Sequence, residues 1–265
     1  MRGQQNFMLH HYTSAYGLEG ILKKDHINLR ATRFSHLNDS KEYNWISEKI
    51  KDKKKDICKS LEIPFDPDQH TYPYVICFAE LADNHLMWKL YGTDGKGYML
   101  TFDYSKLEEF VIEHYKDGDH LQSITYTDET DWELKFFQTL NVFNQIETIC
   151  HSTDIDKVCA FIKRRIYAHE NETRYLRCVH DAMAFSYNGG NHKEVYDGEN
   201  YEKFEFRVSD YGIIPYIDIN LPKDILKSIT IGYGYNFQSQ RDAINLMLQS
   251  RGYTNVELLQ SKIIP

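Results

Sequence analysis

Two carboxylates separated by a single residue, Glu170 and Glu172, lead into a segment whose alternating side chains predict a β-strand. In an extended strand, residues i and i+2 project from the same face, so we expect the two carboxylates to lie side by side. Like charges at this spacing repel and raise each other's pKa unless a cation or hydrogen-bond donors lie between them. Arg174, on the same face of the predicted strand, is a candidate for that cation.

This carboxylate pair has two interpretations. A motif this short is most often the solvated edge of a sheet, and spacing alone favours that interpretation. The alternative is a pair of carboxylates that binds a sugar hydroxyl and stabilises a positive charge developing during a reaction. The choice between them depends on the elements that surround the pair.

A short strand is predicted over residues 7–12, followed by an amphipathic helix. His11, Tyr12 and Thr13 therefore lie at a strand-to-helix junction, where the strand fixes the side chains and the helix N-terminus offers N–H groups to a ligand. The adjacent His10 and His11 are equally compatible with ordinary, partly buried histidines, which is the more common role of such a pair.

Trp88 and Tyr91 lie three residues apart in a predicted short helix over residues 83–92, with Asp83 as its N-cap and Gly92 at its end. Residues at this spacing share one face of a helix. Core packing is the usual role of such a pair, but an aromatic face beside polar strand ends can also hold a flat ring.

A long helix is predicted from about residue 39 to residue 61. Asp39 and Glu42 form a capping box at its start, which explains both residues without a function. The neighbouring Asn38 has no such explanation and is a candidate ligand-binding residue.

The pattern of predicted elements indicates an α+β protein with a single domain over residues 1–265. The continuous apolar run at 74–78 predicts a buried central strand. A helical insertion is expected over about residues 131–167, with its second helix at 154–167. The polar, glycine-containing segment from residue 186 to about 202 predicts a loop.

The chain has 39 acidic and 31 basic residues and a net charge of -8, which excludes a global basic field that would attract nucleic acid or an anionic membrane. Any contact with nucleic acid must be local. The candidate patches are Lys51–Lys55 and the run Lys163, Arg164 and Arg165, although runs of this length are usually the solvated face of a helix.

Five cysteines without a C-x-x-C pair indicate neither a disulfide framework nor a zinc ribbon, so a reducing compartment is expected. No stretch has the roughly 20 apolar residues of a membrane span, and the N-terminus lacks the pattern of a signal peptide. We therefore expect a soluble, cytoplasmic protein with no membrane partner. The twelve histidines include no H-E-x-x-H or comparable ligand spacing, so a metal-dependent hydrolase is disfavoured and no metal is expected.

Several motifs, taken in chain order, resemble those of a widespread bacterial family of unknown function that is grouped with the ADP-ribosyltransferase superfamily. The resemblance spans essentially the whole chain and favours a toxin-like or antiviral-defence member. Ser40 and Tyr167 replace the proline and tryptophan of the family pattern, which affects the expected ring-binding wall rather than the chemistry. The motifs are His11-Tyr-Thr13, Leu37-Asn-Asp-x-x-Glu42, Cys77-Phe78, Met87-Trp-x-x-Tyr91-Gly92, Tyr167-x-x-Glu170-x-Glu172-x-Arg174, Ile231-Gly232 and Ser261-Lys-Ile-Ile-Pro265.

The resemblance implies a split, mixed β-sheet with flanking helices and NAD as co-substrate in the cleft. It implies that His11 hydrogen-bonds the adenosine-side ribose, that Tyr91 with Trp88 packs against nicotinamide, and that Glu172 holds the nicotinamide ribose. Glu170 would orient the acceptor. The further residues expected to contact NAD are Tyr12, Thr13, Asn38 and Arg174.

The resemblance does not identify the acceptor of ADP-ribose, because members of the superfamily modify proteins, small molecules, DNA or RNA. Single-stranded RNA or DNA is our first expectation, with Lys163, Arg164 and Arg165 as the acceptor-binding residues and tyrosines to hold a splayed base. A protein acceptor is the close alternative. By analogy, an enzyme that modifies essential nucleic acid of its own cell is expected to have a neutralising partner, such as an antitoxin. A catalytically inactive module that binds NAD or a nucleotide is the remaining alternative.

Overall fold

The computed structural model of the protein describes residues 7–37, 40–65, 71–114, 119–146, 149, 154–180, 205–209 and 212–264. The strands are β1 (Met8–Thr13), β2 (Ile27–Arg33), β3 (Thr71–Ala79), β4 (Tyr98–Asp103), β5 (Asp119–Ser123), β6 (Thr125–Thr127), β7 (Ile162–Arg164), β8 (Glu172–His180), β9 (Glu205–Ser209), β10 (Gly212–Leu221), β11 (Leu226–Ile231) and β12 (Glu257–Gln260). The helices are α1 (Ala15–Ile21), α2 (Ser40–Lys51), α3 (Lys54–Ser60), α4 (His85–Tyr91), α5 (Tyr104–Glu113), α6 (Trp132–Ile146), α7 (Asp154–Cys159) and α8 (Phe237–Ser250), with short 3-10 helices η1 (Phe34–His36), η3 (Arg165–Glu170) and η5 (Lys223–Ile225).

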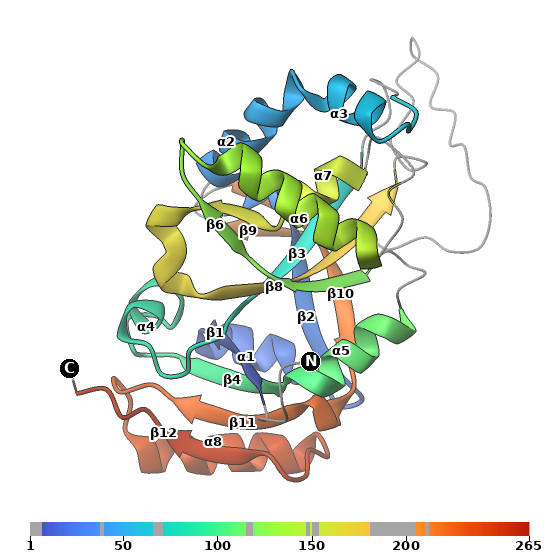
Figure 1. Ribbon diagram of the computed structural model, residues 1–265. Coiled ribbons are helices and arrows are strands. Elements are labelled where there is room, and N and C mark those ends of the chain that lie inside the picture. The colour runs from blue at the N-terminus through green and yellow to red at the C-terminus, as the bar shows by residue number, and fades with distance from the viewer. Residues whose placement is uncertain are drawn as a thin grey trace.

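A mixed β-sheet with helices packed around it forms the body of the protein (Figure 1), which confirms the predicted α+β class. Its strand order is β12-β11-β4-β1-β3-β2-β10-β9, and β8 and β5 branch from β3. Neighbouring strands are antiparallel except β11 and β12, which are parallel. The short strands β6 and β7 pair in parallel as a separate ribbon.

The sheet opens on one edge of β3. Along its other edge, β3 pairs with β8 over its whole length, from Thr71 to Ala79. On the open edge, Tyr74 and Val75 pair with β2, whereas Ala79 alone pairs with β1. Residues 76–78 therefore have no ladder partner on this edge, and β1 and β2 separate there.

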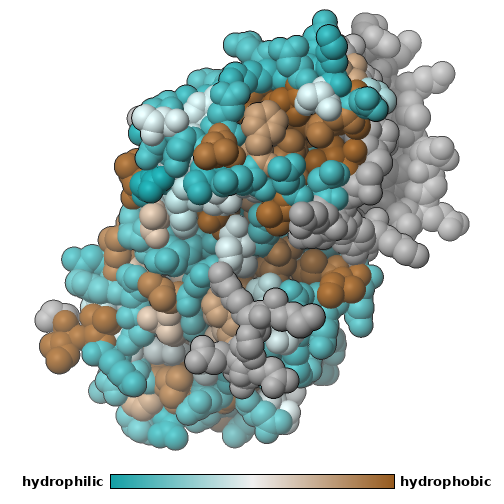
Figure 2. Space-filling model, viewed as in Figure 1, coloured by the Kyte–Doolittle hydropathy of each residue, from teal (hydrophilic) through white to brown (hydrophobic). Residues whose placement is uncertain are grey.

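Two large apolar clusters hold the layers together. One lies where α1, α5 and α8 pack on β1, β2, β4, β10 and β11. The other lies where α2, α3, α6 and α7 cover β3 and β8, at the top of Figure 1. Figure 2 shows a largely hydrophilic surface with hydrophobic side chains gathered over this second layer, where Leu134 and Val142 of α6 are exposed.

The sequence-based prediction of a helix over 154–167 is wrong beyond Cys159. The chain instead forms β7, which pairs with β6, and then the 3-10 helix η3. Phe161 and Ile162 are fully buried in the second apolar cluster. Tertiary burial of this apolar segment therefore outweighs its helical periodicity. Within the expected helical insertion over 131–167, the described residues form the α-helices α6 and α7, followed by β7 and the start of η3.

Two helix predictions need smaller corrections. The helix expected to continue to residue 61 is interrupted at residues 52–53, so that α2 and α3 are separate. Asn84, rather than Asp83, is the N-cap of α4, because its side chain accepts from the N–H groups of residues 86 and 87. Asp83 instead accepts hydrogen bonds from the indole of Trp88, the hydroxyl of Ser261 and a backbone N–H of the C-terminal segment. The expected loop at 186–202 and the capping box at Asp39 lie outside the described residues.

Candidate functional site

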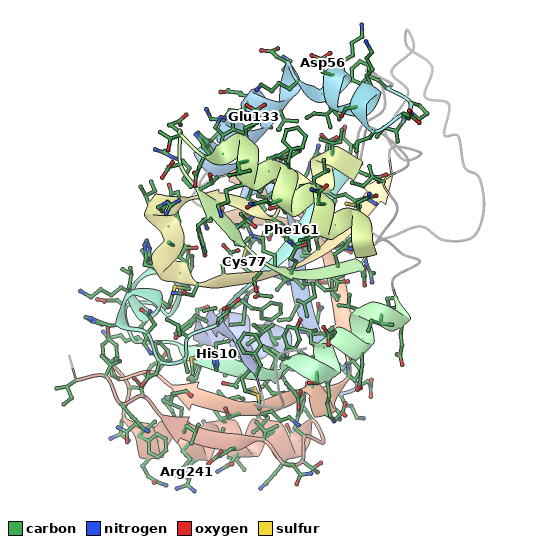
Figure 3. The ribbon with its side chains drawn as sticks, viewed as in Figure 1. His10, Asp56, Cys77, Glu133, Phe161 and Arg241 are labelled. Atoms are coloured by element: carbon green, nitrogen blue, oxygen red, sulfur yellow. The ribbon has the colours of Figure 1, made fainter. Side chains whose placement is uncertain are left out.

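A cleft of about 630 Å³ lies where β1 and β2 separate over the open edge of β3. This volume is within the range of about 300–1,000 Å³ typical of small-molecule sites. Cys77, near the middle of the molecule in Figure 3, and His10 lie on its walls. The cleft is lined by residues of β1, α1, β2, β3, α4, β7, η3, β8 and β9, including His11, Tyr12, Thr13, Cys77, Tyr91, Lys163, Tyr167, Glu170, Glu172, Arg174 and Arg207.

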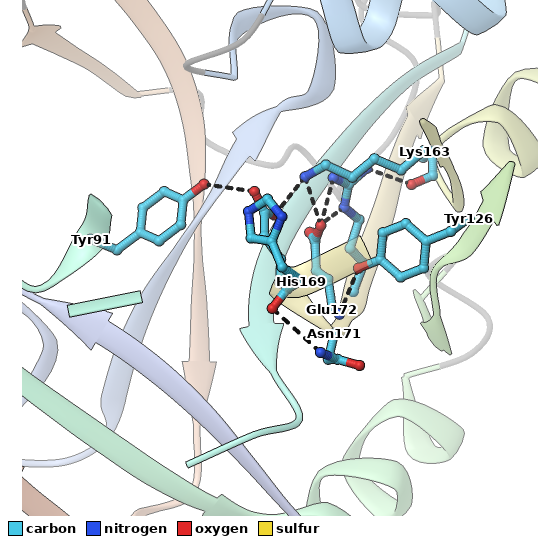
Figure 4. Close-up of polar contacts among 9 residues, drawn as sticks. Tyr91, Tyr126, Lys163, His169, Asn171 and Glu172 are labelled. Atoms are coloured by element: carbon cyan, nitrogen blue, oxygen red, sulfur yellow. Dashed lines mark hydrogen bonds and ion pairs between the residues drawn. The ribbon is translucent and has the colours of Figure 1, made fainter. Parts of the chain in front are cut away.

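One end of the cleft holds a buried cluster of two carboxylates and two cations (Figure 4). Glu172 accepts from the Nε atom of Arg174 at 2.5 Å and from its second guanidinium nitrogen at 3.1 Å. The Nζ atom of Lys163 lies 3.0 Å from Glu172 and 2.7 Å from Glu170, so it bridges the two carboxylates. Arg174 also donates to the carbonyl oxygen of Ala160 at 2.7 Å. The cluster therefore supplies the cations that neighbouring carboxylates require.

Electrostatics keep Glu172 ionised. Burial raises the pKa of this carboxyl, but the charges of Arg174 and Lys163 and the hydrogen bonds from Arg174 and Cys77 lower it by more, to about 2. All four charged side chains of the cluster are buried. Glu172 is thus a fixed anion in a site where water screens charge poorly, which is the environment in which a carboxylate best stabilises a developing cation.

The backbone around the carboxylates differs from the expected strand. Glu170 ends η3, Asn171 has a left-handed conformation with φ 41°, and Glu172 is the first residue of β8. The two carboxylates therefore meet through Lys163 and not as neighbours on one strand face. The expected pairing of Arg174 with Glu172 across positions i and i+2 of the strand is confirmed. The hydroxyl of Tyr126 accepts from the Glu172 N–H at 2.9 Å and fixes the start of β8.

His11 is a neutral hydrogen-bond acceptor in the cleft. Its Nδ1 lies 3.0 Å from the carbonyl oxygen of Cys77, on the open edge of β3. Because a carbonyl only accepts, Nδ1 carries the proton and Nε2 is left as an acceptor in the neutral ring. Burial lowers the pKa of His11, and the charge of Arg207 lowers it further, against the opposing effect of the Cys77 carbonyl. A neutral Nε2 is suited to accept from a sugar hydroxyl.

The other residues of the N-terminal motif have different environments. Tyr12 is buried, and its hydroxyl accepts from the N–H of Asn84 at 2.9 Å, which ties the start of α4 to β1. Thr13 lines the cleft at the end of β1. His10 is an ordinary buried histidine, hydrogen-bonded to Thr101 at 3.1 Å, and burial lowers its pKa to about 4.

The two aromatic residues of α4 separate into a core residue and a cleft residue. Trp88 is 0% exposed, packs edge-on against Tyr12 and Tyr233, and is not among the residues that line the cleft. Tyr91 is 39% exposed and lines the cleft, and its hydroxyl lies 3.4 Å from Glu170. The prediction that Trp88 lines the nicotinamide pocket together with Tyr91 is therefore wrong, because the Trp88 side chain packs into the core.

The run Lys163, Arg164 and Arg165 does not form one surface patch. Lys163 is buried in the carboxylate cluster, so the prediction that it gathers an external polyanion is wrong. Arg165 is exposed and pairs with Asp128 at 3.1 Å and Asp131 at 3.0 Å. The three side chains diverge because β7 alternates its faces and the chain then turns into η3. Asn38, the remaining candidate, lies outside the described residues.

Sequence reasoning missed the bridging role of Lys163 and the arginines at the other end of the cleft, Arg30 and Arg207. A local signal existed for Lys163, since it follows the apolar residues Phe161 and Ile162 and a lysine in such a run is buried only with a charged partner. No local signal marks the two arginines, which come from strands far apart in the chain.

The described residues contain neither a candidate metal site nor a helix suited to span a membrane. No group of three or more His, Cys, Asp or Glu side chains among them is arranged to hold a metal ion. Within the same ranges, no helix combines the length and apolar character needed to cross a membrane.

Comparison with known proteins links part of the chain to a family without an assigned function. No curated protein and no solved structure matches the chain. Residues 87–175, about a third of the sequence, match the model of a family described as a protein of unknown function (DUF2971). The matched segment runs from α4 into β8 and contains Tyr91, Lys163, Glu170, Glu172 and Arg174, so the carboxylate end of the cleft lies within the part of the chain that is similar to this family.

Proposed function

We propose that the protein is an NAD-dependent ADP-ribosyltransferase that works in the cleft between β1 and β2. The observation that carries the proposal is the buried carboxylate of Glu172, held ionised by Arg174 and Lys163 in the same cleft as His11 and Tyr91. Two buried atoms of the cleft, Asn28 Oδ1 and Arg207 Nε, have no hydrogen-bond partner among the described residues. They fit a ligand that carries both hydroxyl and anionic groups, as NAD does.

The residue types suit the chemistry of this reaction. Breaking the bond between nicotinamide and ribose develops positive charge on the ribose ring, and nicotinamide leaves neutral, so no strong general acid is required. Glu172 stabilises the developing charge as a fixed anion. His11 accepts from a ribose hydroxyl, and the ring of Tyr91 packs against the nicotinamide.

Glu170 is proposed to act on the acceptor. It accepts from Lys163 and Tyr91, so its position is set from two sides. The acceptor nucleophile loses a proton as it attacks the ribose, and a carboxylate at this position accepts it as a weak base. Single-stranded nucleic acid remains the first proposed acceptor, with the support of Arg164 and Arg165 rather than Lys163, and a protein acceptor is the alternative.

One observation favours a second function, an inactive module that binds NAD or a nucleotide. Both oxygens of Glu172 already accept hydrogen bonds, from Arg174, Lys163 and Cys77. A carboxylate engaged in this way has less capacity left to accept from a ribose hydroxyl. Under this alternative, the cluster stabilises the fold, and the cleft only binds.

Release of nicotinamide separates the two functions. The full chain is incubated with NAD labelled in the nicotinamide ring and, in parallel, in the adenine, with and without single-stranded RNA, single-stranded DNA and protein mixtures. Nicotinamide release together with adenine label on one acceptor class supports the transferase. NAD binding without release, under every acceptor condition, supports the binding module and contradicts transfer.

A further inference from the structure

The cleft continues past His11 to a positively charged end that takes no part in the proposed bond cleavage. Arg30 of β2 and Arg207 of β9 both line it. The register of β10 with its two neighbours puts Thr32 opposite Tyr216, and Arg207 opposite Ile214. Residues two apart on a strand face the same side, so Arg30, Thr32 and Arg207 project from one face of the sheet.

Contacts within this face leave much of the hydrogen-bonding capacity of the two guanidinium groups unused. Arg207 donates from one terminal nitrogen to Thr32 Oγ1 at 3.3 Å, and its buried Nε has no hydrogen-bond partner in the part of the chain that the structure describes. The Arg30 guanidinium lies over the ring of Tyr216, 4.6 Å from its centre. Burial lowers the pKa of Arg207, and the charge of Arg30, which lines the same cleft, lowers it further.

No ion pair within the described part of the chain compensates this pair of arginines. Among the described residues, no carboxylate oxygen lies within the 4.0 Å ion-pair distance of either guanidinium. Glu19 lines the same cleft, but its carboxylate pairs with Arg251 at 2.7 Å. Asp218 is the register partner of Arg30 on β10 and is exposed to solvent. Two neighbouring cations without a counter-charge are unfavourable, and an anion bound between them relieves the repulsion.

We propose that Arg30 and Arg207 form a phosphate subsite that binds a phosphate group of a small ligand in the cleft. Planar guanidinium groups match the oxygens of a phosphate, which accept two parallel hydrogen bonds. Two acceptors lie in the same cleft, the neutral Nε2 of His11 and the buried Oδ1 of Asn28, which has no hydrogen-bond partner in the described ranges. Both suit hydroxyl groups. Together they define the ligand class as a phosphorylated sugar, such as a nucleotide.

A small ligand fits this subsite better than a nucleic-acid backbone. The Nε of Arg207 is buried within the cleft, where a group at the end of a small molecule reaches it more easily than a continuous backbone does. That this phosphorylated ligand is the substrate rests on the proposed function. Its binding requires no turnover, so the subsite can be tested independently.

Isothermal titration calorimetry of the full chain with ADP and with adenosine tests the subsite. We expect ADP to bind at least tenfold more tightly than adenosine, and inorganic pyrophosphate to compete with ADP. Arg207→Gln and Arg30→Gln should each weaken ADP binding about tenfold or more, the usual effect of losing a charge-assisted hydrogen bond, and leave adenosine binding unchanged. Arg241→Gln is the matched control, because this exposed arginine of α8 lies outside the cleft (Figure 3).

Three results would overturn the subsite. They are equal affinities for ADP and adenosine in the parent protein, unchanged ADP affinity in both arginine variants, or a single-stranded oligonucleotide that displaces pyrophosphate more effectively than ADP does. Thermal unfolding of each variant checks its fold, and the exposed Arg30 carries the test if Arg207→Gln fails to fold. If the protein binds ADP more tightly than adenosine but releases no nicotinamide from NAD, only the proposed transferase is contradicted. If it releases nicotinamide but binds ADP and adenosine equally, only the subsite is contradicted.

Discussion

Replacing Glu172 with glutamine tests the carboxylate cluster most directly, because the change keeps the shape of the side chain and removes its charge. The fully buried guanidinium of Arg174 keeps its hydrogen bond to the carbonyl of Ala160. Its ionised partner, the Glu172 carboxylate, is replaced by a neutral amide. Lys163 loses one of its two carboxylate partners and keeps Glu170. Both stability and chemistry should therefore change, for different reasons.

The expected loss of stability follows from the pKa of Glu172. The difference between the ordinary value of 4.5 and the value of about 2 in the folded protein corresponds to about 3 kcal/mol, at about 1.4 kcal/mol per pH unit. Removing one partner of a buried ion pair typically costs about 3–5 kcal/mol, which agrees in scale. For a chain of this length, a loss of ~3 kcal/mol lowers the melting temperature by roughly 6–12 °C.

The assay measures thermal unfolding and, well below the melting temperature of the variant, nicotinamide release per folded molecule. Loss of a contact that stabilises the transition state should lower turnover about 10²-fold or more. Asp119→Asn is the matched control, since Asp119 is also fully buried and pairs with both Nε and a terminal nitrogen of Arg177, but does not line the cleft. It should lose stability and keep its turnover.

Two results would refute this reasoning about Glu172. Turnover within about threefold of the parent would exclude a catalytic role. An unchanged melting temperature would show that Arg174 and Lys163 do not depend on the charge of Glu172, and that the electrostatic account of the cluster is wrong.

Three further predictions concern residues of the cleft and the exposed Arg165. Tyr91→Ala should weaken NAD binding with little change in melting temperature because Tyr91 is partly exposed, whereas Trp88→Ala, in the core, should cost about 3–5 kcal/mol of stability; binding and unfolding measurements on both variants check this. Because the pKa of Glu172 is lowered by folding, its contribution to stability is complete above about pH 4.5 and is lost as the pH falls towards 2. Urea unfolding across this range should show a decline in stability that is smaller in Glu172→Gln, where only the other carboxyls contribute. Lys163→Gln should destabilise the protein because it leaves the buried carboxylates without their bridging cation, whereas Arg165→Gln, at an exposed position, should change the free energy of unfolding by no more than about 1 kcal/mol. If the acceptor is a single-stranded nucleic acid, Arg165→Gln should also reduce the salt dependence of transfer. Unchanged transfer to an oligonucleotide would show that Arg165 does not bind the acceptor.

Several elements of the fold were predictable because their causes are local. The apolar run at 74–78 predicted the central strand, which is β3. The strand-to-helix junction after β1 was predicted from the change in periodicity, and Ser14 caps α1 as a short polar residue at such a junction does. Residues 162–170 were not predictable in this way, because their strand and 3-10 helix depend on pairing with β6 and on contacts with the carboxylates.

For the candidate site, the sequence by itself determined the pairing of Glu172 with Arg174, since two residues at positions i and i+2 of one strand share a face wherever that strand lies in the fold. It also determined that Trp88 and Tyr91 lie near each other on one short helix. Only the tertiary structure decided which of these two rings enters the cleft, because that depends on how α4 packs against β1. It likewise decided that Lys163 lies between the carboxylates and that His11 and Arg207 line one cleft, because strand order and register bring together side chains that no sequence spacing relates.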